Sequence, residues 1–568
     1  MRDAISQLVS DAIAAAIQAG ELPLAETPDP GVERPRDASH GDWATTIALR
    51  CAKQTGMNPR QVAEIVAAHL TTSEDIDAVE IAGPGFINMR LSATALTRIM
   101  REARQRGLDF GRGDAGGGRR VQVEFVSANP VGPMHVGHGR WAALGDSMAR
   151  VLEHAGWKVE REFYINDAGV QMDIFGKSLA ARYLELLGRE AEFPQDGYRG
   201  TYITEIAEEV RAAEGDVLAD LPYDELWVTC RELGYAICLE NHLKRVLHEM
   251  GVDFDVWFSE RTVHAVRDDG TTEIEDAIAR LTERGYIYEH EGALWFRSTD
   301  FADDKDRVLR KSDGEYTYFA ADIAYHWDKL DVRGFDRVID IWGADHHGYV
   351  ARMKAACAAL GHEGQLDVVI GQLVNLMRGG EPVRMSKRTG EMVTFEELLD
   401  EVGADAARYW FLRRSTDQPV DFDIELARTQ SADNPVYYVQ YAHARICSIL
   451  RRAAGEEAAD TPVASIAASL LSADVDLSPL THETELTLAR KLSEFSEVVE
   501  GAARDLAPFK LTRYAEDLAQ TFHQFYTQCH VLTDDEALAA ARLYAVDATR
   551  SALECVLSLL GVSAPERM

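Results

Sequence analysis

The sequence has few features of a secreted, membrane-bound or disulfide-stabilised protein. Its seven cysteines are scattered over 568 residues without a Cys-x-x-Cys pair, so we expect reduced thiols and no disulfide framework or structural zinc site. No apolar run approaches the length of a membrane span, and the N-terminal MRDAISQLVSDAIAAAIQAG carries acidic residues and lacks the apolar core of a signal peptide. These absences predict a cytoplasmic protein without membrane contact.

Positive charge is also scarce. Lysine and arginine number 59 against 94 aspartates and glutamates, which gives a formal net charge of -35 at pH 7. A chain this acidic repels other polyanions at long range, so we expect weak nonspecific binding to nucleic acid and, at most, binding through local basic patches. One candidate patch is a cluster of arginines in the first quarter of the chain: Arg98, Arg101, Arg104, Arg106, Arg112, Arg119 and Arg120.

The middle of the chain has the pattern of an α/β fold. The strand-like RVQVEFV is followed by a loop, by the amphipathic VGHGRWAALGDSMARVLEHAGW and by a second strand, KVEREFYI. Strand, helix and strand in this order predict a βαβ unit, and hence a Rossmann-like parallel sheet that begins near residue 120. We expect DRVIDIWGA and QLDVVIGQLV to continue this sheet.

The chain is too long for one hydrophobic core, and we expect three or four domains, of which three can be delimited. An α+β added domain covers residues 1–112 and ends in the linker-like GRGDAGGG. A Rossmann-type domain covers 119–430, with an insertion over roughly 170–310 that includes helices and the hairpin GYIYEHEGALWF. An all-α domain covers 434–568, in which DTPVASIAASLLSADVDLSPL reads as a loose loop.

The stretch SANPVGPMHVGHGR, from Ser127 to Arg140, contains the most specific pattern in the chain. A glycine-containing turn into a helix N-terminus offers backbone N–H groups and the positive end of the helix dipole, which bind phosphate. His135 and His138 can donate hydrogen bonds to phosphate oxygens, and Gly137 lets a flat base approach the backbone. Two surface histidines on a capped helix would give the same pattern, and a metal site would need a third ligand.

A second segment, RMSKRTG from Arg384 to Gly390, gives the histidine loop a context. Together the two resemble the HIGH and KMSKS signatures of class I aminoacyl-tRNA synthetases. Six blocks in order narrow the resemblance to the arginyl-tRNA synthetase family: VEFVSANPVGPMHVGHGR, EFYINDAGVQ, SDGEYTYFAADIAYHWDK, WGADHHGYVARMKA, NPVYYVQYAHARI and the terminal APERM. The resemblance implies activation of L-arginine with ATP, followed by transfer to tRNA.

The resemblance also implies which residues contact ATP, used as its magnesium complex. His135, His138 and Lys387 match catalytic positions that stabilise charge on the triphosphate. The full set of matching positions is Asn129, Pro130, Met134, His135, Gly137, His138, Gly343, Asp345, Met385, Ser386 and Lys387. Arg384 replaces the first lysine of the second signature, and a guanidinium fork differs in shape from an ammonium, so its role stays open.

Arginine recognition requires acceptors around a planar, permanently charged group with five N–H donors. Positions matching those of the family are Glu124, Asn129, Tyr318, Asp322 and His346. We expect Asp322 to pair with the guanidinium and Tyr318, one helical turn earlier, to line the slot. Whether Glu124 or Asn129 holds the guanidinium or the amino-acid end stays open, as does the role of His346. The alternative for Asp322 is an ion pair with a neighbour such as Lys329.

The helical C-terminal domain resembles the anticodon-binding domain of the family, and the N-terminal unit resembles its domain for the tRNA elbow. Aromatic and arginine side chains suit unstacked bases, and the candidates are Tyr437, Tyr441, Arg445 and Arg513. The implied partner is tRNA(Arg), for a monomer without a structural metal. Three alternatives stay open: another class I synthetase, a noncatalytic tRNA-binding relative, and a metal phosphoesterase suggested by ADHH at 344–347.

Overall fold

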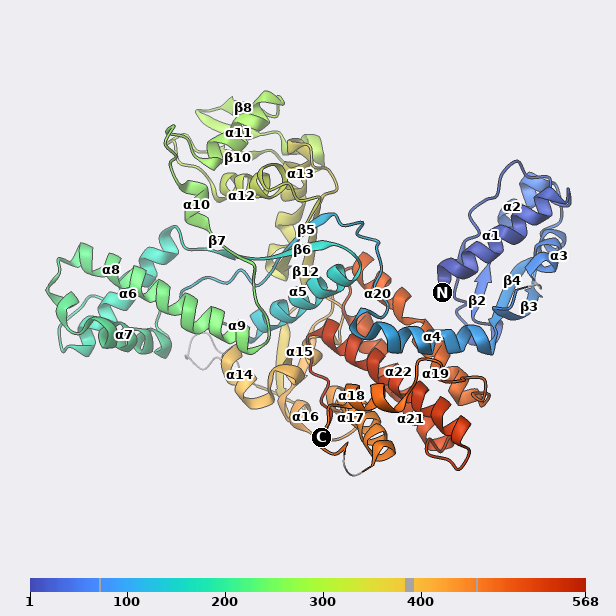
Figure 1. Ribbon diagram of the computed structural model, residues 1–568. Coiled ribbons are helices and arrows are strands. Elements are labelled where there is room, and N and C mark those ends of the chain that lie inside the picture. The colour runs from blue at the N-terminus through green and yellow to red at the C-terminus, as the bar shows by residue number, and fades with distance from the viewer. Residues whose placement is uncertain (71–72, 384–392, 456–457) are drawn as a thin grey trace.

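The structure, a computed structural model, describes residues 1–70, 73–383, 393–455 and 458–568. A central parallel sheet has a mainly helical unit on one side and a smaller α+β unit above it, and the C-terminal helices lie below (Figure 1). The N-terminal unit projects from the opposite side (Figure 1). No helix of the described chain is both long and apolar enough to cross a membrane.

The N-terminal unit is an antiparallel sheet of order β1-β2-β4-β3 packed against helices. Its elements are α1 (Arg2–Gln18), β1 (Val32–Glu33), β2 (Trp43–Thr45), α2 (Ile47–Thr55), α3 (Pro59–Leu70), β3 (Ile76–Ala82) and β4 (Phe86–Leu91). The next helix, α4 (Ala93–Arg106), leaves the unit and packs on the C-terminal helices (Figure 1). The α+β character predicted for this region is confirmed.

The arginine cluster after residue 97 is not a free basic patch. Arg104 forms an ion pair of 2.7 Å with Asp547, and Arg101 donates to the carbonyl oxygens of Ala473 and Val475. Arg98, Arg106 and Arg112 are each paired with an acidic side chain: Asp75, Glu102 and Asp109 respectively. The arginines at positions 119 and 120 donate to the backbone carbonyls of Gly116 and Arg333. These charges fasten α4 and its surroundings, so the patch prediction is wrong.

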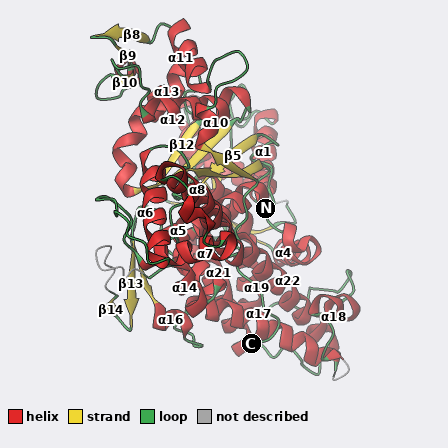
Figure 2. Cartoon of the chain, turned by 90° about the vertical axis from the view of Figure 1, so that its left-hand side faces the viewer, coloured by secondary structure: helices red, strands yellow, loops and turns green. Residues whose placement is uncertain are grey.

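The central sheet has five parallel strands in the order β12-β11-β5-β6-β7. Figure 2 shows strands of this sheet in yellow, with β5 and β12 labelled. Their bounds are β5 (Arg120–Glu124), β6 (Lys158–Ile165), β7 (Val256–Ser259), β11 (Arg337–Gly343) and β12 (Leu366–Gly371). Helix α5 (Val136–His154) connects β5 to β6, so the predicted βαβ unit is confirmed. Strand β7 lies within the interval 170–310 that we predicted as an insertion, and it pairs with β6 from Glu162↔Val256 onward.

Two units therefore flank β7 where one insertion was predicted. The first is helical: α6 (Val170–Leu186), α7 (Thr201–Glu214), α8 (Tyr223–Ile237) and α9 (Arg245–Glu249). The second combines helices with an antiparallel sheet: α10 (Glu260–His264), α11 (Glu273–Glu283), β8 (Ile287–His290), β9 (Ala293–Phe296), β10 (Arg307–Arg310), α12 (Tyr318–Trp327) and α13 (Val350–Leu360). The predicted hairpin corresponds to β8 and β9.

The chain then forms a small sheet of order β14-β13-β15 before the C-terminal helices. The strands of this sheet are β13 (Val374–Arg378), β14 (Glu381–Pro382) and β15 (Val420–Asp423). The helices of the same region are α14 (Phe395–Val402), α15 (Ala404–Leu412) and α16 (Ile424–Arg428). The C-terminal helices are α17 (Pro435–Ala454), α18 (Val463–Leu470), α19 (Glu483–Ser493), α20 (Phe495–Arg504), α21 (Phe509–Gln528) and α22 (Glu536–Leu560).

Two details of the C-terminal region differ from the expectation. Helix α18 occupies part of the predicted loop, because Val463, Ile466 and Ala467 turn one apolar side into the core. The C-terminal helices also do not pack as a separate body, since one continuous cluster of buried residues extends from Ile5 to Val562. The helical character of the region is confirmed.

Close packing of α5 against Phe125, the residue directly after β5, requires a glycine at position 145. A Cβ atom there would lie 2.0 Å from Cγ of Phe125, which is fully buried. We predict that Gly145→Ala lowers the free energy of unfolding by about 1–3 kcal/mol, because the ring must move within a close-packed core. Urea denaturation measures this change, and Gly113→Ala is the control, since a Cβ at 113 meets nothing within 4 Å. Equal midpoints for the two variants would contradict the packing argument.

Candidate active site

A cavity of about 740 Å³ opens where β5 and β11 end. The carboxyl edge of a parallel sheet is the usual ligand position in α/β folds. Nine predicted site residues line the cavity: Glu124, His135, Gly137, His138, Tyr318, Asp322, Gly343, Asp345 and His346. The structure thus brings most of the predicted nucleotide and arginine positions together in one space.

Three predicted residues do not line the cavity. Asn129 is exposed and donates to the side-chain oxygen of Gln171 at 2.8 Å, and Pro130 is buried. Met134 is also buried, and its carbonyl accepts from Phe395 at 2.9 Å. These side chains support the loop between β5 and α5, so the structure does not bring them together with the other candidates.

The N-terminus of helix α5 is capped by the side chains of its own histidines, His135 and His138. The Nδ1 atom of His135 accepts from the Gly137 N–H at 3.1 Å, and Nδ1 of His138 accepts from the His135 N–H at 3.2 Å. The two rings stack with centroids 3.7 Å apart. The unpaired N–H groups expected here are therefore partly satisfied by this capping box. A neutral imidazole that accepts at Nδ1 carries its proton on Nε2, so Nε2 is the donor atom of each ring.

Glycine at position 137 is required by this cap. A Cβ atom there would lie 2.9 Å from Cε1 of His135, which would displace the ring that caps the helix. The glycine has this structural role whether or not a base lies against it.

The second signature, with Arg384, Met385, Ser386 and Lys387, lies outside the described residues. The chain that follows it is joined to the histidine loop. Thr394 forms an antiparallel bridge with His135, and Phe395 donates its backbone N–H to Met134.

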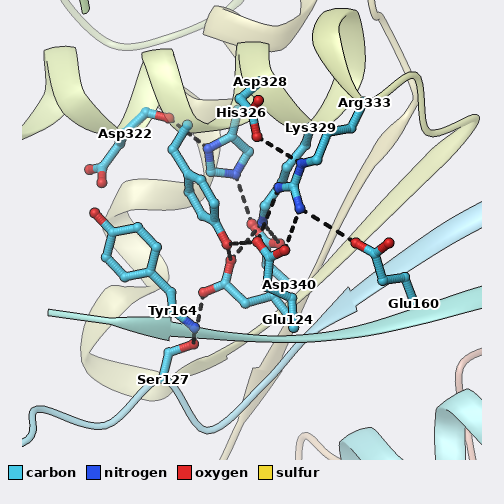
Figure 3. A network of polar contacts seen from close by, with 12 residues as sticks. Glu124, Ser127, Glu160, Tyr164, Asp322, His326, Asp328, Lys329, Arg333 and Asp340 are labelled. Atoms are coloured by element: carbon cyan, nitrogen blue, oxygen red, sulfur yellow. Dashed lines mark hydrogen bonds and ion pairs between the residues drawn. The ribbon is translucent and has the colours of Figure 1, made fainter. Parts of the chain in front are cut away.

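The cavity is also lined by the carboxylates of Glu124, Asp322 and Asp340, which have different partners (Figure 3). Glu124 accepts from Lys329 Nζ at 2.6 Å and from Ser127 Oγ at 2.9 Å. Lys329 is completely buried and also donates to Asp340 at 3.0 Å. Burial alone would lower the pKa of Lys329, but the charges of Asp340 and Glu124 outweigh it and hold the pKa above its ordinary value. Lys329 thus pairs with these two carboxylates, and the alternative of a Lys329–Asp322 pair is wrong.

Asp322 has no lysine or arginine partner in the described chain. Its carboxylate accepts from the hydroxyl of Tyr349, and Figure 3 shows it apart from the cluster around Lys329. Burial raises the pKa of the Asp322 carboxyl to about 6, although the Tyr349 hydrogen bond and the charge of His326 lower it. When ionised, the Asp322 carboxylate has no lysine or arginine counter-ion in the described chain, so it is suited to bind a cationic ligand.

The remaining predicted residues lie near the mouth of the cavity. Tyr318 is 72% exposed and begins α12, one turn before Asp322, as the spacing predicted. Asp345 and His346 lie in the 3-10 turn after β11, where their side chains are 3.5 Å apart and largely exposed. Of the described residues, no three histidines, cysteines, aspartates or glutamates are arranged to hold a metal ion.

A second candidate surface lies on α17 and α21. Tyr437 and Tyr441 stack with centroids 5.9 Å apart, and the guanidinium of Arg445 lies 4.9 Å from the ring of Tyr441 and 5.2 Å from that of Tyr526. A hollow of about 570 Å³ is lined by Tyr441, Arg445 and Tyr526 and extends to the last residue, Met568. Arg513 is exposed elsewhere on α21, and its ring contact is with Phe509 of the same helix.

Comparison with known proteins decides between the open alternatives. The sequence model of the class I tRNA synthetase (R) catalytic domain matches residues 109–432. Models of the arginyl tRNA synthetase N-terminal domain and of the DALR anticodon binding domain match 3–91 and 439–568. The chain belongs to the arginine–tRNA ligase family. It is therefore of a ligase family, and the phosphoesterase alternative is excluded.

Individual members of the arginine–tRNA ligase family match along the whole chain. The arginine–tRNA ligase of Heliobacterium modesticaldum is 48% identical over 572 residues, covering 100% of this chain and 99% of the relative. That of Moorella thermoacetica is 49% identical over 569 residues, covering 99% and 98%. The arginyl-tRNA synthetase structure from Thermus thermophilus has the same fold, with a TM-score of 0.71 and 22% identity over the full length of both chains.

Several cavity residues were not singled out from the sequence. Tyr349, Tyr164 and Trp342 line it, and so do Asn166 and Gln372. The first four lie inside blocks that carried the family resemblance, so their presence there was the available signal. Their roles depend on which side chains they face, and spacing along the chain does not contain that information.

Proposed function

We propose that this chain joins L-arginine to tRNA(Arg) in two steps. The arginine carboxylate attacks the α-phosphorus of ATP; a carboxylate O–P bond forms, and the bond to the bridging oxygen breaks as pyrophosphate leaves. A hydroxyl of the terminal ribose of tRNA then attacks the carbonyl of arginyl-adenylate, AMP leaves and the hydroxyl proton is lost. Neither step needs a protein nucleophile, so catalysis consists of alignment and charge stabilisation.

One observation carries the proposal. A single cavity joins the histidine-capped start of α5 to Asp322, a carboxylate without a cationic partner in the described chain. Such a cavity can hold a triphosphate and a guanidinium side by side.

At the nucleotide end, we assign the Nε2–H groups of His135 and His138 to phosphate oxygens. Gly343 and Asp345 border the same space at the end of β11. Among the described lining residues there is no lysine or arginine. In this proposal Lys387 supplies the positive charge for the β- and γ-phosphates, Met385 and Ser386 accompany it, and Mg²⁺ enters with ATP.

At the arginine end, we assign Asp322 to the guanidinium, with Tyr318 along the side chain. Glu124 is already paired with Lys329, so its negative charge is compensated. In this proposal it offers the ligand a hydrogen-bond acceptor. His346 borders the mouth of the cavity. Asn129, Pro130 and Met134 shape the loop after β5 in this proposal.

The tRNA contacts are further from the chemistry. We assign Tyr437, Tyr441 and Arg445 to anticodon bases, because stacked aromatic rings under a guanidinium bind unstacked bases. We retain Arg513 as a tRNA contact, and the domain of residues 1–112 as the contact to the tRNA elbow. We further propose a cytoplasmic monomer that needs no structural metal.

Arginine-dependent exchange of pyrophosphate into ATP tests the proposal, run with and without tRNA(Arg). Exchange that requires arginine, in either condition, is the expected result. Exchange driven by a different amino acid, or none even with tRNA present, would reject it.

The ionisation of Asp322 predicts how arginine binding depends on pH. The guanidinium stays charged throughout, and with a carboxyl pKa of about 6 the ionised fraction grows about tenfold from pH 5 to pH 7. The KM for arginine should therefore fall about tenfold over this interval and level off above it, because only the ionised carboxylate pairs with the ligand. Exchange kinetics at a series of pH values measure it. A KM for arginine that stays flat from pH 5 to pH 7 would contradict the assignment.

A further inference from the structure

The hydrogen bond between Tyr349 and Asp322 joins two elements that line the cavity. Asp322 belongs to α12, whereas Tyr349 ends the 3-10 turn that follows β11. The same turn carries Asp345, which borders the nucleotide end of the cavity in the function proposed above. Tyr349 thus links the arginine end of the cavity to the segment that borders the nucleotide end.

Two other carboxylates that line the cavity, Glu124 and Asp340, do not depend on a single donor. Glu124 is held by Lys329, Ser127 and the hydroxyl of Tyr325. Asp340 is held by Lys329 and by Nε2 of His326 at 2.8 Å. In the described chain the carboxylate of Asp322 has the Tyr349 hydroxyl as its one hydrogen-bond donor. Its orientation therefore depends on Tyr349.

The ring of Tyr349 is itself fixed. It packs edge-on against Phe319 at 5.9 Å and against Trp342 at 6.1 Å, and the guanidinium of Arg352 lies 4.7 Å from its centroid. A ring held on three sides places its hydroxyl at one point. That hydroxyl bonds Oδ2 of Asp322 and so fixes the plane in which the second oxygen, Oδ1, is presented.

We propose that Tyr349 is a positioning residue that determines how Asp322 meets the guanidinium of arginine. The proposal rests on the arginine site proposed above. A planar guanidinium binds best to a carboxylate that is held in a defined plane. A carboxylate free to rotate would bind a guanidinium less well, whereas an ammonium, which acts as a point charge, would be less affected. Tyr349 therefore contributes to the preference for a guanidinium ligand.

The same hydrogen bond affects the ionisation of Asp322. Burial and the nearby carboxylates of Glu260 and Glu124 raise the pKa of Asp322, and the Tyr349 hydroxyl and His326 lower it. The hydroxyl of Tyr164 also lies in the field of this carboxylate. Removing the hydroxyl of Tyr349 takes away a donor to the ionised form, so the pKa of Asp322 should rise.

Tyr349→Phe tests the proposal, because it keeps the packed ring and removes only the hydroxyl. We expect the KM for arginine to rise about tenfold and the KM for ATP to change by less than about twofold, as for one lost hydrogen bond to a charged group. The acid limb of the arginine KM should also move to higher pH. The matched control is Tyr288→Phe, since the Tyr288 hydroxyl donates to Asp306 at 3.0 Å outside the cavity.

Two outcomes would overturn the proposal. One is an arginine KM and an acid limb that both match the unsubstituted protein. The other is a parallel rise of the KM for arginine and for ATP, which would indicate a packing defect. Failure of the arginine site as a whole is distinguishable, because the unsubstituted protein would then show no arginine-dependent exchange. In an Asp322→Asn background, Tyr349→Phe should have little further effect on the KM for arginine.

Discussion

Asp322→Asn should raise the KM for arginine about 100-fold while the KM for ATP stays within about threefold. The amide keeps the size of the side chain and removes a cavity charge that no described lysine or arginine neutralises. A buried hydrogen bond between charged groups contributes about 1.5–3 kcal/mol, and a factor of 100 corresponds to about 2.7 kcal/mol. Steady-state exchange with each substrate varied in turn measures both constants.

The control for this substitution is Asp306→Asn. Asp306 also accepts a tyrosine hydroxyl, that of Tyr288, but it lies directly before β10 and does not line the cavity. Both substrate constants should stay unchanged in this variant. If Asp322→Asn raised both constants equally, the carboxylate would be a structural group and the assignment to arginine would be wrong.

Asp146→Ala should lower the free energy of unfolding by about 3–5 kcal/mol. Asp146 on α5 pairs with the fully buried guanidinium of Arg408 on α15 and with Arg150 at 2.7 Å. Burial alone would raise the pKa of Asp146, but the charges of Arg408 and Arg150 outweigh it and hold the pKa below its ordinary value. Removing the carboxylate leaves Arg408 buried without a counter-ion, the situation in which broken ion pairs cost most.

Loss of the Asp146 carboxylate should lower the stability of more than one domain. Arg408 also donates to the carbonyl of Leu560, at the end of α22, and to Met250 and Gly251 after α9. Thermal denaturation should therefore show one lowered transition and no separate early transition of the C-terminal helices. Asp109→Ala is the control, because Asp109 pairs with Arg112 in solvent, and its midpoint should stay unchanged. A midpoint for Asp146→Ala equal to that of the control would reject a stabilising role for this pair.

Much of the fold could be predicted because its signals are local. The βαβ unit at β5, α5 and β6 follows from strand and helix periodicities over a few residues each. Strand β7 was missed because four residues, Val256–Ser259, give too short a pattern to separate from an insertion. It becomes a sheet strand only by pairing with β6.

The arginine cluster after residue 97 illustrates the opposite case. Its charge density suggested a basic surface, but Arg104 is fixed by Asp547, which lies 443 residues away in the sequence. Composition records the number of charges in a segment and does not record their partners. The acidic excess of this chain supplies many such partners.

The sequence by itself indicated the family, through motifs that resemble its signatures, and the parallel-sheet fold, because strand and helix periodicities act over short distances along the chain. Only the tertiary structure decided which of the two carboxylates proposed for the arginine end has no lysine or arginine partner. Glu124 and Asp322 are both acidic residues of the same site, but Lys329 reaches Glu124 across 205 residues of sequence and leaves Asp322 to Tyr349. The physical reason is that charge pairing depends on distances of a few ångströms in space, which the packing of α12 against the sheet sets.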